Sequence, residues 1–173
     1  MKTVLAMSIA LIGLVSLAIA DEAQIERGKY LVNLGGCHDC HTPGYFLGKP
    51  DMTQYLGGSD VGLSLPTGVF VGRNLTPDKE TGLGSWTKEQ IIAAFAAGKR
   101  PDGRELAPIM PWEAFSHLTD ADKDAIASYL QSIPAVKRAV PGPFTPNEAP
   151  TVLTFIIVPG DVYASMPKPP AVK

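Results

Sequence analysis

The stretch GGCHDCHTPG, residues 35–44, gathers the rarest chemically active side chains of the chain into one place. The 173-residue sequence has only two cysteines and three histidines, and both cysteines and two of the histidines fall within residues 37–41. Such clustering indicates one site at which two thiols and an imidazole act together. The rest of the chain then has to build helices and loops around that site.

Three chemistries fit two cysteines that are two residues apart. A disulfide between Cys37 and Cys40 would close a strained loop, as in redox-active thiol pairs, but such pairs sit in a βαβ pattern whereas the flanks here are helical. A zinc ion needs four tetrahedral ligands, and the thiols and imidazoles of residues 37–41 are too crowded to supply them. The third chemistry is the attachment of a c-type haem, for which Cys-x-x-Cys-His is the sequence signature.

The haem interpretation explains the clustering. Each thiol adds across one vinyl group of the porphyrin, and the histidine that follows directs its imidazole at the iron. The sequence therefore predicts one covalently attached haem c, with Cys37 and Cys40 as the attachment points and His41 as the proximal iron ligand. His38 occupies a variable position, and we expect it to face solvent.

The first twenty residues read as an export signal. Lys2 is followed by an apolar run from Val4 to Ala20, which ends in the small-x-small pattern of residues 18–20. This is typical of a secretory signal peptide, and the alternative is an uncleaved membrane anchor. No later stretch is long and apolar enough to cross a membrane. We therefore expect a periplasmic protein, which agrees with a haem that is attached outside the cytoplasm.

Removing 20 of the 173 residues leaves 153, enough for one domain with a modest core. The net charge of −2 and the lack of a basic patch exclude a nucleic-acid surface. Eight of the 16 prolines lie after residue 140, so residues 21–138 are predicted as the domain and residues 139–173 as a proline-rich extension. Its apolar run TVLTFIIV, residues 151–158, predicts a strand or extended arm that packs on the domain or on a partner.

The first helix is expected over residues 22–34, where Ile25, Gly28, Leu31 and Val32 share one face. A glycine inside a helix costs about 1 kcal/mol. Gly28 therefore suggests that another backbone approaches closely, unless it is simply a tolerated exposed glycine.

Two further helices carry capping signals. Thr87 and Gln90 form a capping box, Trp86 and Ile91 a hydrophobic staple, and Gly98 ends this helix. The second helix begins after Thr119 and ends before Pro134, and its apolar stripe comprises Ile126, Tyr129, Leu130 and Ile133. The glycine- and proline-rich residues 42–86 are expected to form a long loop around the cofactor, with a short hairpin near residues 66–74.

The sixth position of the iron needs a second ligand, and a methionine thioether there stabilises the reduced state. Met110 lies between Pro108 and Pro111, which stiffen a loop that separates two predicted helices. Met110 is therefore the preferred candidate, with core filling as the alternative role. Met52 is the second choice, His117 a weaker third, and Met166 the least favoured.

Four segments together resemble class I c-type cytochromes: RGKYLVNLGGCHDCHTPG, NLTPDKETGLGSWT, RPDGRELAPIMPW and LTDADKDAIASYLQSIP. More narrowly, residues 24–136 look like the cytochrome c domains of bacterial membrane-bound alcohol, aldehyde and gluconate dehydrogenases. The resemblance implies an all-α fold in which the first and last helices cross near Gly28 and Tyr129, and an axial pair of His41 and Met110. Those dehydrogenase subunits usually carry three such domains and a membrane anchor, so a free-standing electron shuttle fits this chain better.

Four more residues are expected near the haem. The resemblance implies that the Pro50 carbonyl accepts a hydrogen bond from Nδ1–H of His41, although Pro50 would serve equally as a turn proline. Arg73, Asn74 and Trp86 are expected to bond the haem propionates, because buried carboxylates need donors. Asn74 would alternatively cap the turn that follows it.

The function predicted from these observations is electron transfer without enzymatic catalysis. The protein would be a periplasmic monohaem cytochrome that carries single electrons from a dehydrogenase or other respiratory donor to a cytochrome or oxidase. The alternatives are a haem enzyme or gas sensor with an open sixth iron site, and a subunit that docks on a dehydrogenase through residues 151–158.

Overall fold

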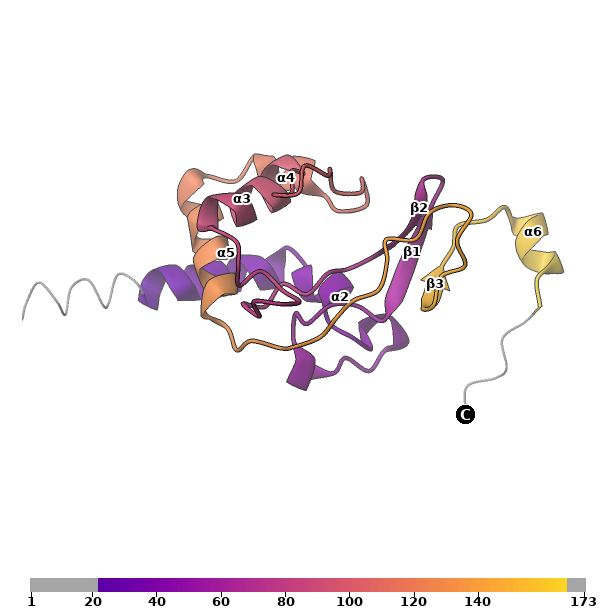
Figure 1. Ribbon diagram of the computed structural model, residues 1–173, viewed down its shortest axis with the longest axis horizontal. Helices are drawn as coiled ribbons and strands as arrows, with labels where there is room; N and C mark the ends of the chain where they lie inside the picture. Colours follow the sequence, from indigo (N-terminus) through magenta and orange to yellow (C-terminus); the bar gives the residue numbers. More distant parts are fainter. Residues whose placement is uncertain (1–21, 168–173) are drawn as a thin grey trace, which may run out of the picture.

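The computed structural model describes residues 22–167, so the expected signal peptide and the last six residues of the expected extension lie outside the described range. A helix over residues 22–34 is followed along the chain by α2 (Cys37–His41), η1 (Tyr45–Leu47), η2 (Met52–Gln54), β1 (Val61–Leu65), β2 (Gly68–Val71), α3 (Lys88–Ala97), α4 (Trp112–Ser116), α5 (Asp120–Ser132), β3 (Leu153–Phe155) and α6 (Gly160–Ser165). Figure 1 shows the helices at one end of the molecule and the sheet with α6 at the other. Within residues 22–167, no helix combines the length and apolar character needed to span a membrane.

The helix over residues 22–34 crosses α5 at Gly28, as the glycine argument predicted (Figure 1). A Cβ atom at Gly28 would lie 2.0 Å from the carbonyl oxygen of Ala125 and 2.7 Å from Cβ of Tyr129. Only a glycine lets the two backbones come this close. The main core forms around this crossing and includes Leu31, Val32, Leu56, Ile91, Ile126, Tyr129 and Leu130.

The expected capping signals of α3 and α5 are confirmed. The Thr87 side chain accepts a hydrogen bond from the Gln90 backbone, and the Gln90 side chain accepts one from the Thr87 backbone. Gly98 ends α3 with a positive φ of 67°. At α5, the Thr119 hydroxyl accepts a hydrogen bond from the backbone N–H of Asp122. Each cap satisfies a donor that the first helical turn leaves unpaired.

A small three-stranded sheet lies beside the helices, so the fold is mainly helical rather than all-α as expected. Strands β1 and β2 form the hairpin that was expected near residues 66–74, and β3 pairs with β1 in parallel, which gives the order β2-β1-β3. Val61 pairs with Leu153, and Leu63 pairs with Phe155. This pairing joins strands that are about ninety residues apart, which local sequence patterns do not reveal.

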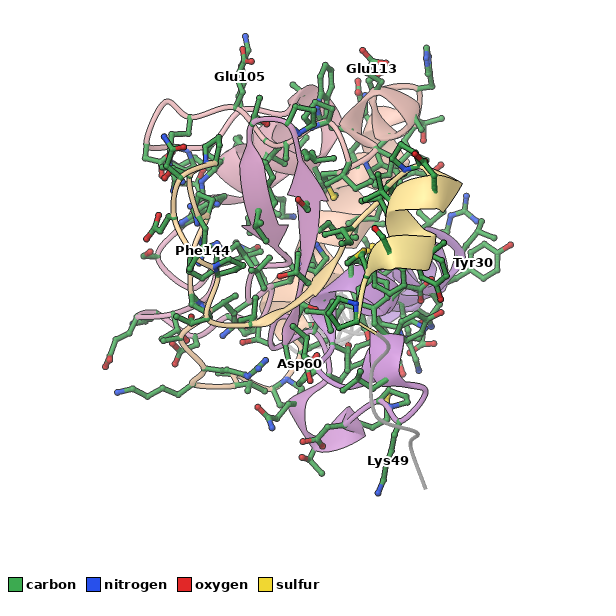
Figure 2. The ribbon with its side chains drawn as sticks, turned by 90° about the vertical axis from the view of Figure 1, so that its right-hand side faces the viewer. Tyr30, Lys49, Asp60, Glu105, Glu113 and Phe144 are labelled. Carbon is green, nitrogen blue, oxygen red and sulfur yellow. The ribbon has the colours of Figure 1, made fainter. Side chains whose placement is uncertain are left out.

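The segment after α5 packs on the hairpin through a second small core. Phe144 is buried with Val69 and Val71, and Val140 and Val152 pack against them. The backbones of Val69 and Phe144 exchange two hydrogen bonds of 2.9 Å. Figure 2 shows Phe144 at one side of the sheet, with α6 in front. The apolar run of residues 151–158 was expected to pack on the domain or on a partner, and β3 within it packs on the domain.

Candidate haem site

A cavity of about 440 Å³ lies between the helices and the sheet. Its size is within the roughly 300–1,000 Å³ that is usual for small-molecule and cofactor sites. α2 supplies Cys37, Cys40 and His41 to its wall, and the loop before α4 supplies Met110. Apolar side chains complete the wall, among them Leu31, Leu83, Phe95 and Leu130 of the main core and Phe115 of α4. The structure therefore places both thiols, one imidazole and one thioether around a single, largely apolar space.

The α2 segment is held in place by the loop that follows it. The carbonyl oxygen of His41 accepts a hydrogen bond of 2.8 Å from the N–H of Gly58. Thr42 is fully buried, and its hydroxyl accepts a hydrogen bond of 3.0 Å from the N–H of Leu56. Gly72, just after β2, lies so close that a Cβ atom there would be 1.7 Å from the carbonyl oxygen of Cys40. Any other residue at position 72 would push β2 away from the Cys-x-x-Cys-His segment.

The Nδ1 atom of His41 lies 2.6 Å from the backbone carbonyl oxygen of Arg73. The prediction that Pro50 accepts this hydrogen bond is wrong. Residues 43–51 fold back on themselves, because the N–H of Lys49 donates to the carbonyl of Gly44 and the N–H of Asp51 donates to that of Pro43, and Pro50 is left exposed. A carbonyl oxygen can only accept, so Nδ1 carries the proton and Nε2 is left for a metal. Burial lowers the pKa of His41, and the Arg73 carbonyl opposes this shift. The lowered pKa suits a neutral imidazole ligand, and the contact with the Arg73 carbonyl fixes which nitrogen carries the proton.

Cys37 and Cys40 are free thiols that face the cavity. Burial raises the pKa of Cys37 to about 11, and burial followed by the charge of Asp39 raises that of Cys40. Redox-active thiol pairs have lowered pKa values. The environment of these cysteines is therefore the opposite of the one that a catalytic disulfide needs.

Of the four candidates for the second iron ligand, the structure brings Met110 to the cavity. Its backbone N–H donates to Ala107 over 2.9 Å and its carbonyl accepts from Trp112 over 2.8 Å, which holds the methionine in a tight turn. Met52 is 58% exposed, and neither Met52, His117 nor Met166 lines the cavity.

Of the three residues that were expected to bond the haem propionates, two lie at the cavity and one does not. Arg73 and Trp86 line the cavity, but Asn74 does not. The Asn74 amide donates to the carbonyl of Val136 over 2.7 Å, and its oxygen accepts from the N–H of Thr76 over 2.9 Å. The propionate role of Asn74 is therefore wrong, and the alternative role as a turn cap is confirmed. The cause is burial, because a buried amide is satisfied by the segments that cover it.

Two arginines at the cavity were missed by sequence reasoning. Arg100 and Arg104 line it and both bond the carboxylate of Asp102. The Arg100 guanidinium also lies 5.1 Å from the ring centre of Trp86. Burial, and then the charges of Arg100 and Arg104, lower the pKa of Arg73. One available signal was the Asp-Gly turn in KRPDGRE, which folds its flanking arginines toward each other just before Met110.

His38 was expected to face solvent, but its ring contacts two aromatic side chains. Its ring makes an edge-to-face contact with Tyr45 at 5.0 Å and lies 6.3 Å from Tyr55. Its Nε2 atom is 3.2 Å from the Asp39 carboxylate. The 3-10 turn η1, which follows α2, brings Tyr45 back against His38, and the His38 side chain remains 30% exposed.

Comparisons with known proteins agree with this geometry. The cytochrome c family model matches residues 25–134. The fructose dehydrogenase cytochrome subunit of Gluconobacter japonicus is 35% identical over 134 residues, which cover 74% of this chain and 26% of that protein. The cytochrome c subunit of the quinone-dependent alcohol dehydrogenase of Gluconobacter oxydans is 38% identical over 111 residues, or 64% of this chain and 22% of that protein. A dihaem c-type cytochrome of Cereibacter sphaeroides is 36% identical over 117 residues, or 65% of this chain and 36% of that protein.

The chain thus spans about a quarter of the length of the first two dehydrogenase subunits. The matched region contains both thiols, His41 and Met110, and it begins and ends close to the two crossing helices. A cytochrome c domain implies covalently bound haem c with its iron, and the cavity carries the groups that such a haem needs. On this evidence the chain belongs to the cytochrome c family.

Proposed function

We propose that this protein is an exported, periplasmic cytochrome that holds one haem c and carries single electrons between redox proteins. The observation that carries the proposal is the arrangement of Cys37, Cys40, His41 and Met110 around one cavity. The single Cys-x-x-Cys-His segment in the sequence supports one haem, and residues 1–20 support export.

The chain's own residues would bind and enclose the cofactor. The two thiols supply the covalent attachment, and the Nε2 atom of His41, left free by the Nδ1 contact with Arg73, supplies the proximal ligand. Met110, on the loop before α4, would supply a second ligand to the iron. When bound, the haem supplies a one-electron couple between ferrous and ferric iron. With His41 and Met110 both bound to the iron, substrates would be kept from it.

Four side chains at the cavity carry hydrogen-bond donors suited to the haem carboxylates. They are Trp86, Arg100, Arg104 and Arg73, and the Arg73 guanidinium also donates to the backbone carbonyls of Val140 and Gly142. Arg100 and Arg104 are oriented by Asp102, which places two positive charges beside one negative charge. A carboxylate that enters this environment finds charge-assisted donors, which are the stronger class of hydrogen bond.

We infer that a dehydrogenase or another respiratory protein donates the electron and that a cytochrome or an oxidase accepts it. The names of the relatives support this inference, since two of them are cytochrome subunits of dehydrogenases. This chain itself performs no substrate chemistry in the proposed role.

Carbon monoxide binding to the dithionite-reduced holoprotein tests the sixth ligand. An unchanged visible spectrum is expected, because Met110 occupies the iron. Met110→Ala should give an immediate carbon monoxide spectrum, whereas Met52→Ala, which removes an exposed methionine, should not. Immediate binding by the unmodified protein would instead favour a haem enzyme or gas sensor.

A redox titration followed by visible absorption tests electron transfer itself. The proposal expects a reversible couple that follows a one-electron Nernst curve. An irreversible transition, or two resolved couples, would refute the single-haem carrier.

A further inference from the structure

The C-terminal arm, residues 151–163, presents an apolar surface that the domain does not cover. Five exposed side chains form it: Leu153, Phe155, Ile156, Ile157 and Val162, and Ile157 alone is 92% exposed. β3 is one of the two edge strands of the three-stranded sheet, so one side of its backbone is unpaired within the described residues. Figure 2 shows β3 and α6 on the face turned toward the viewer. Clustered apolar side chains at an open sheet edge mark an interaction surface.

This arm is fixed to the domain. β3 is hydrogen-bonded to β1, and Val152 packs against the small core of Val69, Val71 and Phe144. The arm therefore presents its apolar side chains in a set position, which lowers the entropy cost of binding.

A continuous series of ring contacts connects the arm to the haem-attachment helix. Phe155 lies 5.7 Å from Phe46, Phe46 lies 5.8 Å from Tyr45, and Tyr45 lies 5.0 Å from His38. These are contact distances for aromatic rings. His38 belongs to α2, between the two cysteines that would hold the haem. Electron tunnelling is favoured where atoms are in contact, and this series links the exposed arm to α2 without a gap.

The charge around the arm indicates the kind of partner. Residues 139–167 contain two acidic side chains, Glu148 and Asp161, and no lysine or arginine, while Lys168 and Lys173 follow in the sequence outside the described residues. Asp60 lies just below the sheet in Figure 2, while the basic Lys49 points away at the lower end of the molecule. An apolar centre with an acidic rim complements an apolar centre with a basic rim. An anionic membrane surface would instead require basic residues here.

We propose that the arm is the docking surface for a redox protein whose own electron-transfer group lies behind an apolar patch ringed by lysine or arginine. The electron passes between that group and the haem along Phe155, Phe46, Tyr45 and His38. In the forward direction the ferrous protein loses one electron, the oxidised partner gains it, and no bond or proton changes place. This proposal rests on the proposed function, because it assumes that the cavity holds a haem.

The test uses the full-length holoprotein and, as a probe, a monohaem cytochrome with a lysine ring around its exposed haem edge. Titration of the ¹⁵N-labelled holoprotein with this probe should shift the amide signals of residues 153–157. Ile157→Asn combined with Val162→Asn should weaken binding about tenfold, as loss of a central apolar contact does. Leu34→Asn is the matched control, because Leu34 is 68% exposed but lies outside the arm, and it should change nothing.

Two further variants separate charge from electron transfer. Asp161→Asn should reduce the salt dependence of probe binding. Phe46→Leu should leave probe binding intact and slow the electron transfer measured by stopped-flow absorption, because it interrupts the ring contacts.

Several outcomes would overturn the proposal. The first three are the absence of probe binding, amide shifts confined to the cavity mouth around Ile109, and unchanged probe affinity in the double arm variant. The other two would point to another occupant of the arm: loss of vesicle binding in the arm variants would indicate a membrane, and conversion of a dimer to a monomer by the same changes would indicate a second copy of this chain. Failure of the proposed function is separate, because it appears as a missing reversible couple in the redox titration, whatever the binding experiment shows.

Discussion

Replacing Gly28 with alanine should destabilise the protein by about 2 kcal/mol, although alanine is the better helix former. The reason lies in the crossing with α5. The added Cβ would lie 2.0 Å from the carbonyl oxygen of Ala125, 2.6 Å from its carbonyl carbon and 2.7 Å from Cβ of Tyr129. These atoms belong to, or are attached directly to, the α5 backbone, so no flexible side chain can move aside.

The magnitude follows from two opposed effects. Carbon and oxygen atoms that are not bonded approach to about 3.3 Å, so the helices would have to separate by more than 1 Å. Overpacking of this kind costs about 3 kcal/mol, the upper part of the observed range, because the obstacle is backbone. The better helix propensity of alanine returns about 1 kcal/mol. The net loss of about 2 kcal/mol corresponds to a fall in Tm of about 4–8 °C for a domain of this size.

Urea unfolding of the holoprotein, followed by far-ultraviolet circular dichroism, measures this change. Gly160→Ala is the matched control, because a Cβ atom at Gly160, the first residue of α6, meets nothing within 4 Å. That variant should have unchanged or slightly raised stability. If Gly28→Ala is as stable as the unmodified protein, the close crossing of the two helices is wrong.

Three other changes test separate parts of the structure. Gly72→Ala should cost about 3 kcal/mol or more and reduce the haem content per chain, because its Cβ would lie 1.7 Å from the Cys40 carbonyl oxygen; pyridine haemochrome absorbance measures that content. Thr87→Ala should lower the unfolding free energy by about 1 kcal/mol through loss of the α3 cap, as measured by urea unfolding. The third change concerns Asp102, whose pKa is lowered to about 2, chiefly by its hydrogen bond with Arg104. The ionised Asp102 stabilises the fold fully above its ordinary pKa of 3.8, and this stabilisation is lost as the pH falls toward 2. Asp102→Asn lacks this ionisable group, so its stability should fall less between pH 3.8 and pH 2 than that of the unmodified protein. The difference should be below about 1 kcal/mol and is measured by thermal melts over this pH range.

Each of these changes has an outcome that would contradict it. Full haem loading of Gly72→Ala would mean that β2 can move away from α2 without harm. Thr87→Ser keeps a capping hydroxyl, so a loss as large as that of Thr87→Ala would remove capping as the cause. An Asp102→Asn protein with the same acid profile as the unmodified protein would show that the Asp102–Arg104 contact adds nothing to stability.

Local patterns predicted the helices because the signals lie within a few residues of each other. The capping box of Thr87 and Gln90 involves positions three apart, and the apolar stripe of α5 repeats within two turns. Gly28 carried information about a distant contact, since a glycine on the apolar face of a helix has to be explained by whatever packs there. The Cys-x-x-Cys-His segment was readable for the same reason, as all its chemistry lies within five residues.

The contacts that finish the site are long-range and were predicted poorly. The expected His41 partner was Pro50, nine residues away, but the structure uses the carbonyl of Arg73, 32 residues away. Asn74 was assigned to the cofactor, but it bonds Val136, which is 62 residues away. Every residue has a backbone carbonyl, so sequence identity does not mark which one will accept a hydrogen bond.

The amino-acid sequence by itself determined the haem-attachment chemistry, the helices with their caps and the preference for Met110, because each depends on residue type and short spacing. The tertiary structure alone decided which carbonyl orients His41, that Arg100 and Arg104 reach the cavity, and that β3 adds to β1 in parallel and leaves an apolar edge exposed. The physical reason is that these features arise from packing between segments 30 to 90 residues apart, where burial and mutual hydrogen-bond satisfaction, rather than local preference, select the partner.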